Sequence, residues 1–327
     1  NWIGNGATIF YIYVHSISEE VDMMIKLYEQ QKNIEVVRVN WPTVPTARGV
    51  DDDRNPNNRM FRMEGRIALN DCILRARAKA YLVATSDLDE IIAPLNLYGQ
   101  NETLLNIIDG HLEMSDKLEN RPGAFLFRNC FTYSKNDDWL SISHPSQLKF
   151  DQYHTVDYSV DVFPRGERSK VIYVTDRVFR ANIHDVIDFE AKHTTMVDID
   201  SNRARMLHFR KVNTTLFMTL ISRQNIVRNS EVLKHAAAGW QAAYTARIDA
   251  VMKNNTLNSQ LVGAFNLTFS TPKWPNLGEK VLSEIGSCCY KNYQMFQDAC
   301  FTEMRCRSEL KTLRPEQWVE PDSDESW

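Results

Sequence analysis

Apolar and polar positions over the first 40 residues follow a strand, a helix and a second strand. Thr8–Val14 contains only β-branched and aromatic residues, which is typical of a fully buried strand. Apolar residues then return with helical spacing at Val21, Met24, Ile25 and Tyr28. Glu35–Val39 is rich in valine and predicts the next strand. A strand, a helix and a strand in so short a span predict a right-handed crossover in a parallel sheet.

The rest of the chain continues this alternation. The segment 41–60 is rich in Pro, Asn and Asp and is long enough to suggest a functional cover. Strands are predicted near 81–85, 123–127 and 170–174, and helices near 62–80, 213–227 and 231–252. The chain is Cys-rich from Gly286 and acidic from Pro315. We therefore predict an α/β domain over residues 1–270 and a Cys-rich extension with an acidic tail over residues 271–327.

One predicted strand runs directly into an acidic cluster, in 80-AYLVATSDLDEIIAPL-95. An unpaired buried carboxylate costs several kcal/mol, so three carboxylates after a buried strand need an explanation. Either they lie at the exposed tip of the strand, or a positive group is held there. Open parallel sheets bind their ligands at the carboxyl ends of their strands, which is where this cluster is expected.

Asp87 and Asp89 have the spacing of a divalent-metal site. Residues two apart in a strand face the same way, so both carboxylates can converge on one ion. Carboxylate oxygens favour Mg²⁺ or Mn²⁺, with phosphate oxygens and water as the other ligands. The Asp-x-Asp pattern is weak alone, and Asp198/Asp200, which follows Met196-Val197, is a rival. A strand-end turn without metal is the remaining interpretation.

Composition narrows the class of protein. The chain has 327 residues, 43% of them hydrophobic, which is enough for a large core in one or two domains. A formal net charge of -4 gives no support for nucleic-acid binding. No apolar run approaches the roughly 18 residues that a membrane-spanning helix needs. Membrane attachment is therefore expected only through an anchor upstream of this sequence.

Cysteines and sequons favour a secretory lumen. Asn-x-Thr sequons occur at Asn101, Asn213, Asn254 and Asn266. The six cysteines match no common zinc pattern, and four of them, Cys288, Cys289, Cys300 and Cys306, lie close to the C-terminus. Adjacent cysteines rarely bond each other, so we expect Cys288 and Cys289 each to pair with Cys300 or Cys306. Buried thiols and chance sequons are the alternative interpretation.

The run 70-NDCILRARAKAYLVATSDLDEIIAP-94 resembles the signature of glycosyltransferase family 92. The stretches 6-GATIFYIY-13 and 124-AFLFRNCF-131 resemble strands of that family. Lys170-Val171-Ile172, Ile183-His184 and 206-MLHFRKV-212 resemble its later signatures. The resemblance covers about residues 5–250.

The resemblance implies a GT-A-like fold, a Rossmann-type mixed sheet flanked by helices, whose N-terminal strand is expected to be missing here. It also implies a metal-dependent, inverting enzyme of the Golgi lumen. The expected donor is a UDP-sugar, most often UDP-galactose, and the expected acceptor is a glycan. Mn²⁺ or Mg²⁺ is the expected cofactor.

The resemblance also assigns roles to single residues. Asp87, Asp89 and His208 are the expected metal ligands, although a histidine between Leu207 and Phe209 equally suits a core position. Arg210 is expected to contact phosphate, or else to form a surface ion pair. Asp71 and Arg75 would contact the donor, with an i,i+4 helix pair as the alternative.

An inverting transferase needs a carboxylate base to take the proton of the attacking hydroxyl. Asp185 is the candidate, and its rivals are Asp138, Asp188 and Glu190. Two other functions stay open at this stage. One is an inactive lumenal carbohydrate-binding module of the same fold, and the other is a glycosidase with two carboxyl groups about 5–10 Å apart and no metal.

Overall fold

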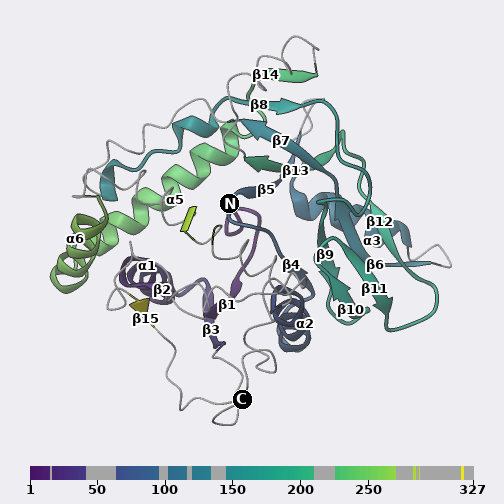
Figure 1. The fold of residues 1–327 in the computed structure, drawn as a ribbon, viewed down its shortest axis with the longest axis horizontal. Helices are drawn as coiled ribbons and strands as arrows, with labels where there is room; N and C mark the ends of the chain where they lie inside the picture. Colours follow the sequence, from purple (N-terminus) through teal and green to yellow (C-terminus); the bar gives the residue numbers. More distant parts are fainter. Residues whose placement is uncertain are drawn as a thin grey trace. The chain divides into compact units, whose positions relative to one another are not determined.

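The computed structural model describes residues 1–14, 17–41, 64–95, 102–115, 120–133, 145–209, 225–269, 283–284, 287 and 318–319. These residues form a mixed α/β structure, as predicted, whose strands are divided among five sheets (Figure 1). The chain falls into two compact units, each made of separate segments. The first comprises residues 1–7, 69–139 and 149–246, and the second comprises residues 8–68, 140–148 and 247–327.

The second unit contains the predicted strand–helix–strand motif. Strand β1 (Ile9–Val14) pairs in parallel with β3 (Glu35–Asn40), and helix α1 (Glu19–Glu29) connects them, which confirms the parallel pairing. Helix α1 packs on α6 (Asn255–Phe269). The short strands β2 (Ile17–Ser18) and β15 (Trp318–Val319) pair antiparallel.

Ion pairs fasten α1 to β3 in this unit. Arg38 of β3 pairs with both Asp22 and Glu29 of α1, and Lys26 adds a second cation on Asp22. Burial raises the pKa of Asp22, but the hydrogen bonds from Lys26 and Arg38 outweigh it and lower that pKa overall.

The first unit is built on two larger mixed sheets. The four-stranded sheet has the order β12 (Thr194–Asp198), β6 (Arg121–Phe127), β9 (Lys170–Val174), β4 (Leu82–Ala84). The five-stranded sheet has the order β14 (Ile226–Ser230), β8 (Val156–Ser159), β7 (Asn129–Tyr133), β13 (Ala204–Phe209), β5 (Glu90–Pro94). Only Arg128 separates β6 from β7, so the chain passes straight from one sheet into the other.

A hairpin and one helix complete the first unit, and two further helices span the division between the units. Strands β10 (Val178–Asn182) and β11 (Asp185–Phe189) form an antiparallel pair, and α3 (Leu104–Ser115) packs on β5 and β6. Helices α2 (Glu64–Ala76) and α5 (Lys234–Met252) each carry residues of both units. Asn70 of α2 holds the main chain of Ala181 in β10 through two hydrogen bonds.

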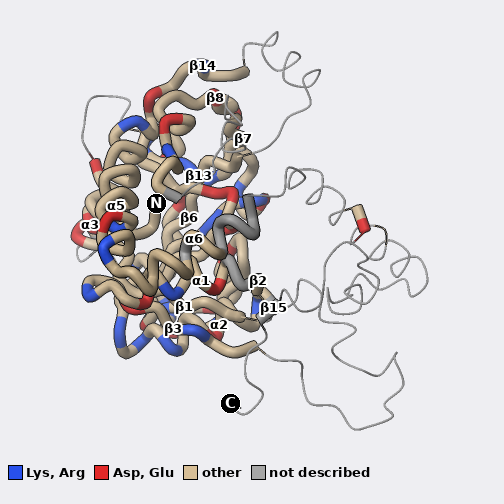
Figure 2. Tube along the Cα trace, turned by 90° about the vertical axis from the view of Figure 1, so that its left-hand side faces the viewer, with Lys and Arg blue, Asp and Glu red and all other residues tan. Residues whose placement is uncertain are grey.

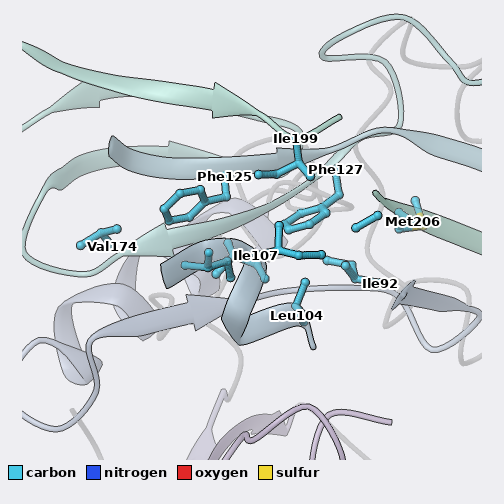
Figure 3. Close-up of a cluster of buried hydrophobic side chains, with 11 residues drawn as sticks. Ile92, Leu104, Ile107, Phe125, Phe127, Val174, Ile199 and Met206 are labelled. Carbon is cyan, nitrogen blue, oxygen red and sulfur yellow. The ribbon is translucent and has the colours of Figure 1, made fainter. Parts of the chain in front are cut away.

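The core of the first unit lies between the two sheets and α3. Leu104 and Ile107 of α3 face Phe125 and Phe127 of β6, with Ile92 of β5 beside them (Figure 3). Strand β6 is buried over nearly its whole length, because the sheet is covered on the side of α3 and continued by neighbours on both edges. This packing fixes the ends of β5, β7 and β9, which start at Glu90, Asn129 and Lys170.

Two expectations about secondary structure differ from the structure. Ile226 and Val227, predicted to end a helix, begin strand β14, because their β-branched side chains pair with β8. Strand β4 was expected in a parallel arrangement, but it pairs antiparallel with β9 at the edge of its sheet. The remainder of the helix predicted near 213–227 lies outside the described residues.

Charged residues of both signs are interspersed along the described trace (Figure 2), in agreement with 38 basic and 42 acidic residues in the sequence. No helix within the described ranges is both long and apolar enough to cross a membrane. The described cysteines, Cys72 and Cys130, are free thiols, and burial raises the pKa of each to about 11. The Cys-rich extension and its predicted disulfides lie almost entirely outside the described residues.

Candidate active site

The acidic cluster forms a tight loop between β4 and β5. Glu90, the first residue of β5, donates its main-chain N–H to the carbonyl of Asp87. Its own side chain turns back, and Oε2 accepts the main-chain N–H of Asp87 at 2.8 Å. The loop therefore closes on itself, while the side chains of Asp87 and Asp89 stay 67% and 48% exposed.

A buried lysine supplies the positive charge that the acidic cluster requires. Lys170 Nζ lies 3.1 Å from Glu90 Oε2 and 3.2 Å from Asp87 Oδ2. The side chains of Lys170 and Glu90 are both only 2% exposed. A charge buried this deeply is tolerated only with a hydrogen-bonded partner of opposite sign. Both interpretations of the cluster thus hold in part, because the aspartates are at an exposed tip and a cation is held beneath them.

His208 supports the other aspartate. Its Nε2 lies 3.1 Å from Asp89 Oδ2, and the main-chain N–H of Phe209 donates to the carbonyl of Asp89. On the far side of the ring, Asn129 Nδ2 lies 3.2 Å from His208 Nδ1. Asn129 Nδ2 also donates to the carbonyl of Arg168, which fixes this amide as the donor. His208 Nδ1 must therefore accept, and Nε2 carries the proton that Asp89 receives as a hydrogen bond.

Strand register brings these residues together. In the five-stranded sheet, His208 of β13 lies opposite Glu90 of β5 on one side and Phe131 of β7 on the other. Directly opposed residues project from the same face of a sheet. Lys170 reaches this row from β9 of the neighbouring sheet, close to the point where Arg128 joins β6 to β7. The site thus lies where the two sheets meet.

The donor atoms suit a hard divalent cation better at the aspartates than at the histidine. Among the residues that the structure describes, no group of three or more His, Cys, Asp or Glu side chains is arranged to hold a metal ion. The exposed carboxylates of Asp87 and Asp89 are of the type that Mg²⁺ and Mn²⁺ prefer. Ligation by His208 Nε2 would require its proton to move to Nδ1, where the Asn129 amide is a donor at 3.2 Å and the Glu90 carboxylate lies farther away, with Oε1 at 3.8 Å. His208 as a metal ligand remains a prediction that this hydrogen-bond pattern disfavours.

The carboxylates of the rival motif, Asp198 and Asp200, both have hydrogen-bond partners within the protein. Arg128 grips Asp198 with both Nε and Nη2, at 3.2 Å and 2.6 Å from Oδ2. This hydrogen bond, together with the charge of Asp198, raises the pKa of Arg128. Asp200 Oδ1 accepts the main-chain N–H of Asn202 in the turn before β13. Both carboxylates therefore have structural roles, which leaves Asp87 and Asp89 as the better candidates.

Asp185 lies at the start of β11, beside the turn of the β10–β11 hairpin. Its carboxylate is exposed and accepts the main-chain N–H of Val186, and no cation of the described residues pairs with it. Burial, and then the negative charge of Asp185, raise the pKa of Tyr173. The neighbouring His184 contacts the carbonyl of Ser169 at 2.6 Å, and Ser169 precedes Lys170. The hairpin turn is thereby tied to the segment that carries Lys170.

The rivals of Asp185 have other partners. Asp188 pairs with Arg180 across the hairpin at 2.7 Å, and Glu190 pairs with Arg77. Asp138 lies outside the described residues. Of the described candidates for a catalytic base, Asp185 is therefore the one whose carboxylate has no cationic partner.

Asp71, Arg75 and Arg210 are the other residues that were expected to contact the donor. Asp71 and Arg75 form an intrahelical ion pair on α2 at 2.6 Å, which is the alternative that the sequence left open. Their contact with a donor stays a prediction. Arg210 lies outside the described residues.

Two residues of the site, Lys170 and Asn129, were not assigned a role from the sequence. Lys170 opens the apolar run 170-KVIYV-174, and a lysine in a fully buried strand is itself a signal that a carboxylate lies nearby. The sequence does not say which carboxylate, because Lys170 and Asp87 are 83 positions apart. Asn129 gives no such signal, since asparagines are common in turns and strand ends.

The family model of glycosyltransferase family 92 matches residues 1–247. This match covers both larger sheets and every residue of the site described above, and it confirms the resemblance seen in the sequence motifs. No curated protein matches the chain.

Proposed function

Because the chain belongs to glycosyltransferase family 92, we propose that it is a metal-dependent, inverting galactosyltransferase that uses UDP-galactose as its donor. Family membership itself implies glycosyl transfer from a nucleotide sugar to a glycan acceptor. The observation that carries the finer proposal is the acidic loop, whose two exposed aspartates are held from beneath by a buried lysine and a histidine. Exposed carboxylates whose positions are fixed by neighbouring side chains suit a divalent cation that binds together with the donor diphosphate.

In this proposal Asp87 and Asp89 hold Mn²⁺ or Mg²⁺ against the donor diphosphate. The ion, when bound, offsets the negative charge that builds on the departing UDP. Glu90 and Lys170 keep the loop in place. His208 orients Asp89 by donating its Nε2 proton.

Asp185 is the proposed catalytic base. It would take the proton of the acceptor hydroxyl while the hydroxyl oxygen forms a bond to the anomeric carbon of galactose. The bond from that carbon to the UDP oxygen breaks, and its electron pair leaves with UDP. The support for this role is the absence of a cationic partner among the described residues, which leaves the carboxylate of Asp185 able to accept a proton.

The proposal includes a GT-A-like fold and action in the Golgi lumen. The parallel β1–α1–β3 unit and an acidic motif that follows a strand are features expected of that fold. Asn254, one of the sequon asparagines, is exposed and accepts the main-chain N–H of Leu257 at the start of α6. An exposed sequon is accessible to glycosylation, which supports the lumenal assignment.

The test is a screen of UDP-sugars with the purified protein, which follows the release of UDP in the presence and absence of Mn²⁺. We expect UDP-galactose to be hydrolysed slowly, with transfer speeding up when glycans are added as acceptors, and EDTA to abolish both reactions. Release from a different UDP-sugar would keep the transferase and change the donor. A protein that binds a glycan array but releases UDP from no donor would instead be a carbohydrate-binding module.

A further inference from the structure

In the segment that precedes Lys170, one arginine has a backbone conformation that residues with a side chain disfavour. Arg168 has φ +54°, in the left-handed region that residues with a Cβ rarely adopt. It lies two positions before Lys170, in the segment that borders the site. Strained residues persist where the surrounding structure fixes them, and such places are frequently functional.

Asn129 fixes the segment that carries Arg168. Its side-chain Nδ2 donates to the carbonyl of Arg168, and its main-chain carbonyl accepts the N–H of Phe163 at 2.9 Å. One fully buried residue therefore anchors both ends of the loop 163–168. The same amide contacts His208, so the loop and the imidazole beside Asp89 share an anchor.

The guanidinium of Arg168 rests on two aromatic rings. Its Cζ lies 5.6 Å from the centre of the Phe131 ring and 5.1 Å from that of Phe163, and the two rings meet edge to face. The Phe131 ring in turn lies 6.0 Å from the His208 ring. Stacking on the two rings therefore positions the guanidinium near Phe131, which neighbours His208 in the sheet. The N–H groups of the guanidinium remain available for another partner.

No described carboxylate pairs with Arg168, although it is exposed. Other arginines of this unit do have such a partner, among them Arg128, Arg180 and Arg203. An arginine that is strained, stacked and without an acid is prepared for an external anion, and its planar fork fits phosphate oxygens.

We propose that Arg168 binds a phosphate oxygen of the nucleotide-sugar donor. This inference rests on the proposed function, since it takes the donor diphosphate as the anion. Asp87 and Asp89 then meet the diphosphate through the metal, and Arg168 meets it directly. The stacking on Phe131 and Phe163 positions the guanidinium before the donor arrives.

Calorimetric titration tests the inference with two probes, UDP in the presence of Mn²⁺ and inorganic pyrophosphate in the presence of EDTA. Arg168→Gln should weaken the binding of both probes by roughly tenfold or more, because it removes charged hydrogen bonds. The matched control is Arg165→Gln, which removes the same charge from an exposed position of the same loop. It should change either affinity by less than about twofold. Equal effects of the two substitutions would overturn the inference.

Arg168→Gly separates ligand binding from a structural role. Glycine adopts a left-handed φ without strain, so the melting temperature should stay the same or rise while the affinity for pyrophosphate falls as in Arg168→Gln. A lower melting temperature with unchanged affinity would show that Arg168 is structural and would contradict the inference.

The two proposals fail in different ways. If the protein binds UDP with Mn²⁺ equally well with and without Arg168, the transferase stands and the role of Arg168 does not. If pyrophosphate binds in an Arg168-dependent manner but UDP does not bind, the anion site stands and the UDP donor does not. Binding of neither probe would contradict both.

Discussion

Two of the chain's Asp-x-Asp motifs look alike in sequence and differ in the folded protein. Asp198 is the last residue of β12 and forms a bidentate contact with Arg128, and Asp200 follows the strand and accepts a hydrogen bond in a turn. Asp87 and Asp89 follow β4, where each carboxylate has a partner but remains about half exposed or more.

The difference lies in the kind of partner. A guanidinium fork satisfies both oxygens of Asp198 and leaves little capacity for an ion. Lys170 is a point charge that is shared between Asp87 and Glu90, and His208 contacts one oxygen of Asp89. The spacing of an Asp-x-Asp motif is therefore not enough to identify a metal site. The number of carboxylate oxygens that remain able to bind an ion in the folded protein is more informative.

The largest expected effect compares the two motifs in catalysis. Asp89→Asn should lower sugar transfer by roughly three orders of magnitude, because several kcal/mol of charge stabilisation by the ion would be lost. Asp200→Asn is the matched change and should leave the rate within about twofold, since an asparagine oxygen can still accept the N–H of Asn202. The measurement is the initial rate of galactose transfer, with circular dichroism to check folding. Reversed effects would move the donor site to the rival motif.

The next effect concerns the carboxylate proposed as the base. Asp185→Asn should reduce transfer by roughly 10²–10⁴-fold, as expected for the loss of a general base, with UDP affinity unchanged. Asp188→Asn, on the same hairpin, serves as the control because Asp188 is already paired with Arg180. A pH–rate profile of each variant checks the assignment, since only Asp185→Asn should remove the acidic limb. Full activity of Asp185→Asn would pass the role to another carboxylate.

A smaller effect is expected in stability, where the two motifs again differ. Lys170→Met leaves Glu90 buried without its cation, and the free energy of unfolding should fall by about 3–5 kcal/mol. The double variant Lys170→Met/Glu90→Gln removes both buried charges and should recover most of that loss. Denaturant unfolding measures both. If the double variant were as unstable as the single one, packing rather than charge would explain the effect.

The smallest effect on stability is expected at Asp198 of the rival motif. Asp198→Asn breaks an ion pair whose side chains are partly exposed, so it should cost at most about 1 kcal/mol. Because solvent screens this pair, the cost should shrink further in 1 M salt. Unfolding curves at low and high salt would show this. If the free energy of unfolding fell as much as in Lys170→Met, the Arg128–Asp198 pair would be as poorly screened by solvent as the Lys170–Glu90 pair.

Local patterns in the sequence predicted much of the fold. The strands that became β1, β3, β6 and β9 were expected close to their observed bounds, because each is rich in β-branched and other apolar residues. Strands β6 and β9 are buried along most of their length, whereas β1, expected to be fully buried, and β3 are largely half-buried. The pairing of strands was harder to predict from the sequence. The antiparallel pairing of β4 with β9, for example, joins residues about 90 positions apart in the chain. Ile226 and Val227 show the same limit, because their strand exists only through pairing with β8.

For the site, the sequence identified three of its residues and not the groups that contact them from beneath. Asp87, Asp89 and His208 were recognised by type and order along the chain. Lys170, Asn129 and Arg168 were not, because their roles arise from contacts across strands that only the folded chain brings together. Asp71 and Arg75 were assigned to the donor site from the family resemblance, and in the structure they form an ion pair with each other on α2.

The most direct test of the account is the binding of Mn²⁺ with UDP, followed by electron paramagnetic resonance of the free ion. Three proteins are compared: the wild type, Asp87→Asn/Asp89→Asn and Asp198→Asn/Asp200→Asn. The wild type and the second variant should bind one ion per chain with similar affinity, and the first variant should bind none. Retained binding in the first variant, together with its loss in the second, would contradict the central claim that the loop after β4 is the metal and donor site.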